Sequence, residues 1–304
     1  SGNKYVPKKI IEKWQRRDPL LFFENYLLKN KIINKKIIKS IEEKIDSKIS
    51  YALEKCINKQ KTKTSINKEI SDVYSNNQFQ LLKPKTKKSN NVRYVDAIKD
   101  SLYLKMVQDK TVIIMGQDIA EYGGVFKVTE GFLDKFGKER VRNTPITESA
   151  VIGTAMGLSF KGFKPIVEMQ FADFVSNGFN QIVNNLAKTH YRWGQPVNVT
   201  LRLPTGAGIG GGPFHSQSNE SWFFHVPGLK IVYPSNPYDA KGLLCTAIDD
   251  NNPVLFFEHK ALYRSIKQVI PDDLYNIEFG KLKVIQEGSD ITIITYGLGV
   301  EWSK

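Results

Sequence analysis

The sequence predicts an α/β protein whose core is a doubly wound, mostly parallel sheet, preceded by an α-helical arm. Between about residues 92 and 257, apolar segments of strand length alternate with patterns of helical spacing. The stretch 145–191 has the order helix, buried strand, helix, which is typical of such a sheet. The first 90 residues differ from the rest because basic residues far outnumber acidic ones, and from about residue 58 Lys, Thr, Asn and Ser dominate, which sets an arm and a linker apart from the globular part.

Residues 1–57 are predicted to form a helical arm. Asp18 followed by Pro19 is typical of an N-cap with proline at the first helical position. Asn34 is expected to cap a further helix, in which apolar residues recur every three or four positions up to Leu53. Amphipathic helices this short do not bury their apolar sides by themselves, so we expect the arm to dock on a larger surface.

Residues 58–90 are predicted to be a flexible, Lys-rich linker, because polar residues dominate and little periodicity remains. A globular domain is predicted over 91–280. Its expected helices are 94–107, 131–136, 148–160, 179–186, 219–224 and 238–248, and its expected strands are 111–115, 141–144, 165–171, 197–203, 229–233 and 253–257.

Residues 281–304 are predicted to begin a further domain. Two apolar segments, 282–285 and 291–295, have the length and composition of strands, and the glycines at 297 and 299 are expected to lead into a helix. The chain stops at residue 304, so we expect this domain to be truncated here.

The chain carries a formal net charge of +13, and all of this excess lies in the arm and linker. Residues 1–90 hold 22 Lys and Arg against 9 Asp and Glu, so the globular part is neutral. A solvated face is the simplest interpretation of the basic arm, since no nucleic-acid-binding module accompanies it. No apolar run has the length of a membrane span, and two distant cysteines exclude a disulfide framework.

Two residues of the central stretch are candidates for a site. Glu148 stands at a predicted helix start, and Phe174 lies just beyond the carboxyl end of a predicted strand, where open α/β sheets bind ligands. The helix dipole favours a carboxylate at that position whatever its role, and an isolated phenylalanine is usually a core residue. The residues alone leave both interpretations open.

The glycine-rich loop 206–212 precedes His215. This loop lacks the Gly-Lys-Ser/Thr ending of a P-loop, and Pro213 separates it from any helix, which argues against nucleotide binding. The imidazole of His215 can transfer a proton near neutral pH, although a lone histidine is often a surface or core group. The chain has no G-x-S-x-G or H-E-x-x-H motif, so a serine hydrolase and a zinc site are disfavoured.

Taken together, several blocks resemble the β subunit of the thiamine-diphosphate-dependent 2-oxo acid dehydrogenase E1 component. The blocks are GQDIAEYGGVFKVTEG, TPITESAVIG, EMQFADF, FNQIVNNLAK, HSQSNESWFFHVPGLKIVYPS and NNPVLFFEHKALYR. The arm blocks EKWQRRDPLLFFENYLLKN, IEEKIDSKISYALEKC and SDVY resemble the C-terminal end of the E1 α subunit. The resemblance implies a fused E1 with a transketolase-like pyrimidine-binding domain over 91–280, and favours the branched-chain (2-oxoisovalerate) type over the pyruvate type.

The resemblance also implies roles for individual residues. Glu148 would hydrogen-bond the aminopyrimidine of thiamine diphosphate, and Phe174 would stack on that ring. Ile146 and Gln170 match further positions that line the cofactor pocket. His215 matches the histidine that handles protons and orients the lipoyl group during reductive acylation.

Other parts of the site are expected outside this chain. The family's diphosphate–Mg²⁺ motif lies in the α part, and no Gly-Asp-Gly…Asn sequence occurs here. The chain is therefore expected to bind only the pyrimidine half of the cofactor and to be inactive alone. Asp250 and Asn252 match a region where some relatives hold a monovalent cation such as K⁺, and otherwise form a simple turn.

The expected partners are an E1 α part, in a dimer or heterotetramer, and a lipoyl-bearing E2 acyltransferase. The expected location is the bacterial cytoplasm, or the mitochondrial matrix in a eukaryote. No nucleic acid or membrane partner is expected. Two other functions stay open: a transketolase-like thiamine enzyme, which would need basic residues for a sugar phosphate, and an inactive interaction module with a basic arm.

Overall fold

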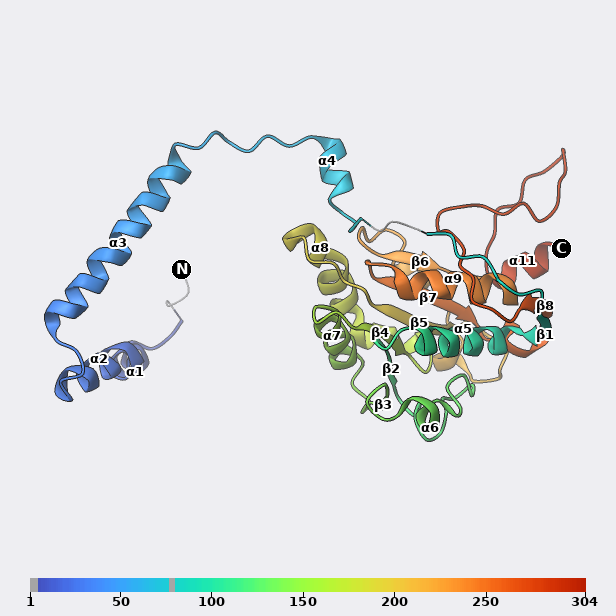
Figure 1. Ribbon diagram of the computed structural model, residues 1–304, viewed down its shortest axis with the longest axis horizontal. Coiled ribbons are helices and arrows are strands. Elements are labelled where there is room, and N and C mark those ends of the chain that lie inside the picture. Colours follow the sequence, from blue (N-terminus) through green and yellow to red (C-terminus); the bar gives the residue numbers. More distant parts are fainter. Residues whose placement is uncertain (1–4, 77–79) are drawn as a thin grey trace. The chain divides into compact units, whose positions relative to one another are not determined.

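The computed structural model describes residues 5–76 and 80–304, which form two compact units divided after Thr64. The first unit contains α1 (Lys8–Gln15), α2 (Pro19–Lys29) and α3 (Lys35–Ile57), as predicted for the arm (Figure 1). The Asp18 carboxylate accepts from the Leu20 N–H at 2.8 Å and the Asn34 side chain from the Ile37 N–H at 3.0 Å, so both predicted caps are confirmed. Among the described residues of this unit none is buried. No described helix of the chain is long and apolar enough to cross a membrane.

The second unit is built around a six-stranded sheet in which every neighbouring pair is parallel. The strand order is β3-β2-β4-β5-β7-β6. The central strands β5 and β7 are buried along their whole length, because helices cover both faces and leave neither face to water. The predicted parallel α/β class is confirmed. The strands are β2 (Val112–Gly116), β3 (Val141–Asn143), β4 (Lys164–Glu168), β5 (Thr200–Thr205), β6 (Lys230–Val232) and β7 (Val254–His259).

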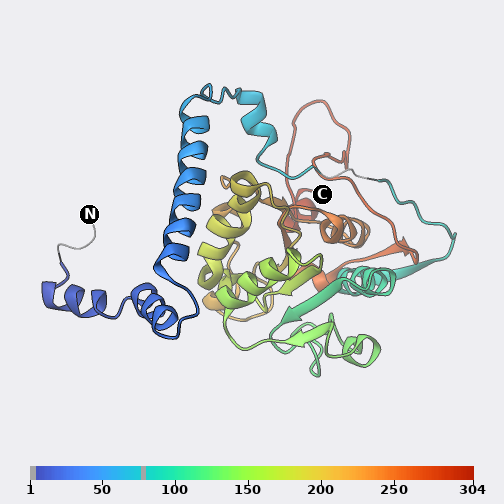
Figure 2. The ribbon, with the colours of Figure 1, turned by 60° about the vertical axis from the view of Figure 1, so that its left-hand side comes forward.

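Helices lie on both faces of this sheet (Figure 2). The helices α5 (Tyr94–Gln108) and α9 (Pro237–Asp249) share one hydrophobic core with β2. The other face is covered by α7 (Glu148–Ser159) and by a π-helical turn, Gln181–Leu186, which continues into α8 (Ala187–Trp193). The smaller elements are α6 (Phe132–Phe136), α10 (Leu262–Ser265) and the 3-10 turns η1 (Ala172–Gly178), η3 (Pro213–His215) and η4 (Glu220–Trp222).

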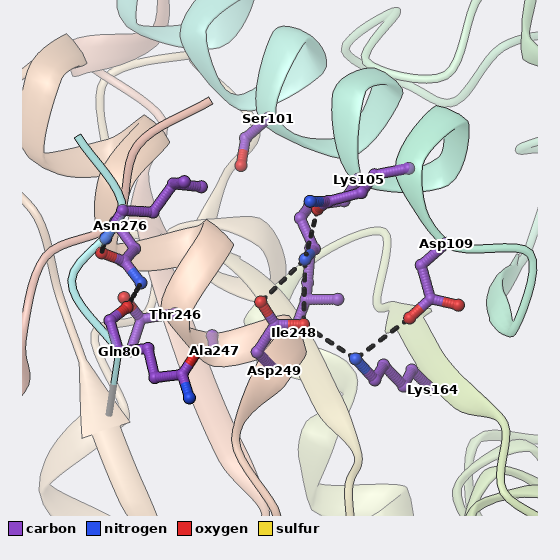
Figure 3. A network of polar contacts seen from close by, with 12 residues as sticks. Gln80, Ser101, Lys105, Asp109, Lys164, Thr246, Ala247, Ile248, Asp249 and Asn276 are labelled. Atoms are coloured by element: carbon purple, nitrogen blue, oxygen red, sulfur yellow. Dashed lines mark hydrogen bonds and ion pairs between the residues drawn. The ribbon is translucent and has the colours of Figure 1, made fainter. Parts of the chain in front are cut away.

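A charged network joins the start of β4 to the helices α5 and α9 (Figure 3). Lys164 on β4 contacts Asp109 at 3.0 Å and Asp249 at 2.8 Å, and the buried Lys105 of α5 binds the same Asp249 at 2.7 Å. The ammonium groups are partly or fully removed from water, so the paired carboxylates are needed to hold them there. This network lies at the end of β4 opposite to the candidate site.

The second half of the predicted linker contacts the globular domain. After α4 (Ile66–Ser71), Ser75 exchanges two backbone hydrogen bonds with the Asn252 side chain, at 2.7 and 3.0 Å. Further along, Asn276 accepts from the Leu82 N–H at 2.7 Å and donates to the Gln80 carbonyl at 2.8 Å (Figure 3). The segment ends in β1 (Ser89–Arg93), which pairs antiparallel with β8 (Lys267–Pro271). These contacts come from distant asparagines and a distant strand, so local composition did not reveal them.

Residues 281–304 differ from the prediction. No strand forms at 282–285 or 291–295 in the described structure, and the apolar side chains there are mostly exposed, from Leu282 at 86% to Ile285 at 50%. A strand requires a partner for its backbone groups, and no described strand pairs with these segments. The expected helix after Gly297 is present as α11 (Leu298–Ser303).

Candidate functional site

The predicted site residues follow the carboxyl ends of neighbouring strands. Gln170 and Phe174 come after β4, and His215 comes after β5. Since β4 and β5 are parallel, their carboxyl ends meet at the same edge of the sheet. That edge is where open α/β sheets bind ligands.

An aromatic cluster brings two of the predicted residues together. The ring centroid of His215 lies 4.7 Å from Phe171 and 5.6 Å from Phe174, and both contacts are edge-on. Phe171 and Phe174 also pack edge-on, with their centroids 5.9 Å apart. Edge-on contacts at these distances are favourable for aromatic rings. The imidazole therefore has a defined orientation against the ring predicted to stack on the cofactor.

Gln170 is adjacent to this cluster in sequence and is half-buried. Its amide donates a 2.9 Å hydrogen bond to the carboxylate of Asp118, which follows β2. Asp118 has a positive φ of 56°, a backbone conformation that aspartate adopts more readily than most residues. Gln170 thus connects the loops that follow β2 and β4.

Glu148 is the first residue of α7 and is buried, with 8% of its surface exposed. Its carboxylate accepts no hydrogen bond from any described residue. It lines a cavity of about 420 Å³ together with Thr147, Asn177 and Gln181. A buried carboxylate normally has partners, so this one is available to a ligand that donates a hydrogen bond.

The turn η1 connects the acid to the aromatic cluster. Phe174 and the cavity residue Asn177 both belong to η1, which packs against α7. A side chain at Gly178 would collide with the terminal methyl of Ile152 on α7, so Ile152 would have to shift to admit one. The cavity itself does not include Phe174, Gln170 or His215.

Ile146 is not brought together with the other predicted residues. It lies two residues before α7, is 79% exposed and lines no part of the cavity. Its role as a pocket residue stays a prediction, and its exposed side chain is free to contact a partner chain.

Asp250 and Asn252 have protein partners. One Asp250 oxygen binds the Lys230 ammonium at 2.6 Å, and the other accepts two hydrogen bonds from Asn252. The remaining capacity of the Asn252 side chain is used by Ser75. An ammonium group occupies the place that a cation would need beside Asp250, so these side chains do not fit a K⁺ site.

Two charged residues of this region were not predicted. Asp173 on η1 is buried, and its Oδ2 has no partner among the described residues. Lys260 follows β7, is 3% exposed, and its ammonium lies 5.4 Å from the Phe171 ring centroid. Burial lowers the pKa of Lys260 to about 8, although the charge of Asp173 opposes this shift. Both residues lie within blocks that resemble the E1 β subunit. A charged residue in such an apolar block is the sequence feature that could have marked each of them as a site residue.

The comparison with known families decides the classification. The model of the transketolase pyrimidine-binding domain matches residues 90–266. The chain belongs to this family. The transketolase pyrimidine-binding domain therefore covers the sheet, both helical layers and every predicted site residue.

Relatives of this transketolase-type domain include β subunits of two dehydrogenases. The chain is 50% identical over 214 residues to the 2-oxoisovalerate dehydrogenase subunit beta of Bacillus subtilis, covering 69% of this chain and 65% of the relative. It is 44% identical over 211 residues to the pyruvate dehydrogenase E1 component subunit beta of Staphylococcus epidermidis, with the same coverage. The chain thus spans 65% of the length of these curated relatives.

A solved structure described as "Split gene transketolase, inactive beta4 tetramer" matches with a TM-score of 0.55. The match covers 69% of this chain and 64% of that chain at 21% identity, and a likeness at this identity shows the fold alone.

Proposed function

We propose that this chain is the β-type part of a 2-oxo acid dehydrogenase E1, which oxidatively decarboxylates a 2-oxo acid with thiamine diphosphate and acylates the lipoyl group of an E2. The observation that carries the proposal is Glu148, a buried residue whose carboxylate has no hydrogen-bond partner among the described residues and which lines a cavity. The two β-subunit relatives support the same enzyme class.

The residues present fit the pyrimidine half of the cofactor. The Glu148 carboxyl group would hydrogen-bond the N1′ nitrogen of the ring and share a proton with it, which requires a carboxyl group that is not already paired. Phe174 would supply a flat apolar face for stacking. Thiamine diphosphate, when bound, supplies the carbanion chemistry, while the protein supplies position and electrostatics.

His215 would handle a proton and orient the lipoyl group during reductive acylation. Its ring is held edge-on by Phe171 and Phe174, so one edge of the imidazole is fixed. Gln170 and Ile146 would line the pocket, Ile146 from a surface that a partner completes. Mg²⁺ and the diphosphate would be held by the α part, and K⁺ at Asp250 is not part of this proposal.

A branched-chain 2-oxo acid is the favoured substrate, with pyruvate second. The identity to the 2-oxoisovalerate relative is 50% against 44% for the pyruvate relative, which supports this order. The preference would be set by pocket contacts shared with the α part, since the α part completes the cofactor site.

The partners in this proposal are an E1 α part, fused or separate, in a dimer or heterotetramer, and a lipoyl-bearing E2. The arm helices, with no buried residue among those described, would be the end of an α part that docks within the assembly. Cys56 and Cys245 are free, which suits a reducing compartment such as the bacterial cytoplasm or the mitochondrial matrix.

Two alternatives remain to be tested against the E1 proposal. A transketolase-like enzyme is supported by the fold but not by the identity to dehydrogenase β subunits. An inactive interaction module is supported by the basic arm, and its partner binding would weaken strongly with added salt.

The test is the complete gene product assayed with Mg²⁺, thiamine diphosphate and an artificial electron acceptor, comparing 3-methyl-2-oxobutanoate with pyruvate. We expect turnover of one or both acids, and a loss of roughly 100-fold or more in Glu148→Gln. Glu139→Gln, at an exposed carboxylate, is the matched control and is expected to keep full activity. Full activity of Glu148→Gln would overturn the assignment of this residue. No turnover by a folded, cofactor-loaded enzyme would overturn the E1 proposal.

A further inference from the structure

The loop that carries His215 is rich in glycine. Four of its glycines, at 206, 208, 210 and 212, have φ between 72° and 105°. Glycine supplies no side chain for packing and has the largest backbone freedom in the unfolded chain. Within the loop, the His215 Nδ1 lies 3.1 Å from the Gly211 carbonyl and the His215 N–H bonds the Gly212 carbonyl at 3.3 Å. These bonds stay inside the loop, so the position of His215 relative to Phe174 must be set by contacts that lead out of it.

Those contacts lie immediately after His215 and lead back to η1. The Asp173 carboxylate accepts a 3.0 Å hydrogen bond from the backbone N–H of Gln217. The Asn219 side chain donates a 2.8 Å hydrogen bond to the carbonyl of Ala172. Asp173 and Asn219 are 5% and 1% exposed, so water does not compete for these bonds. We call these two hydrogen bonds the η1 latch.

The other side of the loop is held by β5. The Gln217 carbonyl accepts hydrogen bonds from the Gly206 N–H at 2.9 Å and from the Thr205 hydroxyl at 3.0 Å. These bonds close the base of the loop on the strand, but they do not involve η1. Among the described residues, the latch makes the polar connection between the loop of His215 and the turn that carries Phe174.

We propose that Asp173 is a positioning residue for His215, which holds the imidazole against Phe174 so that both approach one ligand as a unit. This inference rests on the proposed function for its catalytic consequence. Asp173 directly precedes Phe174 in η1, and its hydrogen-bond partner Gln217 lies two positions after His215. A shift of either end would separate the two rings, whose centroids lie 5.6 Å apart.

The latch bond needs an acceptor at position 173 but no charge. Burying the Asp173 carboxylate without a full set of hydrogen-bond partners is unfavourable. Its Oδ2 is unpaired among the described residues, while Oδ1 makes the latch. An asparagine would provide the same acceptor without the charge. Asp173→Asn should therefore keep the latch, whereas Asp173→Ala removes it.

The first measurement is amide hydrogen exchange over residues 213–219 in the complete protein, a readout that needs no activity. We expect exchange to accelerate roughly 10-fold or more in Asp173→Ala and to stay near wild type in Asp173→Asn. Thr189→Ala is the matched control, because it removes a buried hydroxyl whose partner is its own helix. Unchanged exchange in Asp173→Ala would overturn the latch.

The second measurement is a double-mutant cycle on acyl transfer to the lipoyl group. We expect Asp173→Ala to lower this rate roughly 10- to 100-fold, and to have no further effect in a His215→Ala background. An equal loss in both backgrounds would assign Asp173 a general structural role and overturn the proposal. If Asp173→Ala does not fold, Asn219→Ser breaks the second latch bond and is expected to show the same two effects more weakly. Absence of any 2-oxo acid turnover in the wild type would refute the proposed function, while hydrogen exchange would still test the latch.

Discussion

Arg202 and Glu258 form a doubly hydrogen-bonded pair between β5 and β7, with both nitrogen–oxygen distances at 2.7 Å and both side chains fully buried. Glu168 at the end of β4 binds the same guanidinium, and the Tyr263 hydroxyl donates to Glu258 at 2.6 Å. Burial raises the pKa of Glu168, although Arg202 opposes this shift. This network connects β4, β5 and β7 directly before the segments that carry Gln170 and Lys260.

Replacing Arg202 by Met is expected to destabilise the domain by about 3–5 kcal/mol at pH 7, because two buried carboxylates lose the cation that they share. Urea unfolding followed by circular dichroism measures this change. Arg142→Met removes an exposed ion pair with Glu139 and is expected to cost less than about 1 kcal/mol. Equal effects of the two substitutions would contradict a structural role for the buried network.

Lys260→Met is expected to stabilise the domain by about 1–3 kcal/mol at pH 7, since burial of this ammonium lowers its pKa to about 8. Between about pH 8 and 10.5 the unfolded lysine binds more protons than the folded one, so wild-type stability rises with pH there. The advantage of Lys260→Met should consequently shrink by about 2 kcal/mol between pH 7 and pH 9.5. Unfolding curves at both pH values test this, with the exposed Lys138→Met as control. A constant difference at both pH values would argue against the lowered pKa.

Asp109→Asn is expected to destabilise the domain by about 1–2 kcal/mol at pH 7. Burial alone would raise the pKa of Asp109, but hydrogen bonds from Thr111 and the Lys164 ammonium outweigh it and hold this pKa at about 2. Figure 3 shows the contact between Asp109 and Lys164. The contribution is fully present above about pH 4 and is lost as pH falls towards 2, where variant and wild type should converge. Acid titration of both proteins measures this. Divergence instead of convergence at low pH would refute the assignment.

Asn252→Ala is expected to release the segment after α4, because the Ser75 N–H and carbonyl lose their buried partner. We expect a loss of about 2–3 kcal/mol and faster tryptic cleavage at the lysines between 83 and 88. Asn180→Ala, at an exposed asparagine, is the control. Cleavage at the wild-type rate would show that the hydrogen bonds to Ser75 do not hold this segment.

Local sequence was sufficient for the elements that depend on short-range chemistry. Asp18 and Asn34 were recognisable as caps because capping involves residues two or three positions away. The central strands were recognisable because strands covered on both faces are mostly apolar. The two apolar segments after residue 281 have the same local character, yet they form no strand, because strand pairing depends on a neighbour that local sequence does not supply.

Some residues of the candidate site were likewise recognisable from local sequence, and others were not. Glu148 and Phe174 were marked by their places at a helix start and after a strand, and His215 by its chemistry and its preceding loop. Asp173 and Lys260 were missed, because their significance comes from burial beside Phe171 and the His215 loop. Asp250 and Asn252 resembled cation ligands in sequence, but Lys230 and Ser75 reach them in the folded chain.

The sequence by itself determined the order of the six sheet strands, the two arm caps and the family, and it marked the candidate residues, since all of these are written in short-range patterns and blocks. Tertiary structure alone decided which charges are paired, which carboxylate stays free, and how His215 is held against Phe174. These outcomes depend on contacts between residues far apart in the chain, whose energies follow from burial and distance in the folded protein.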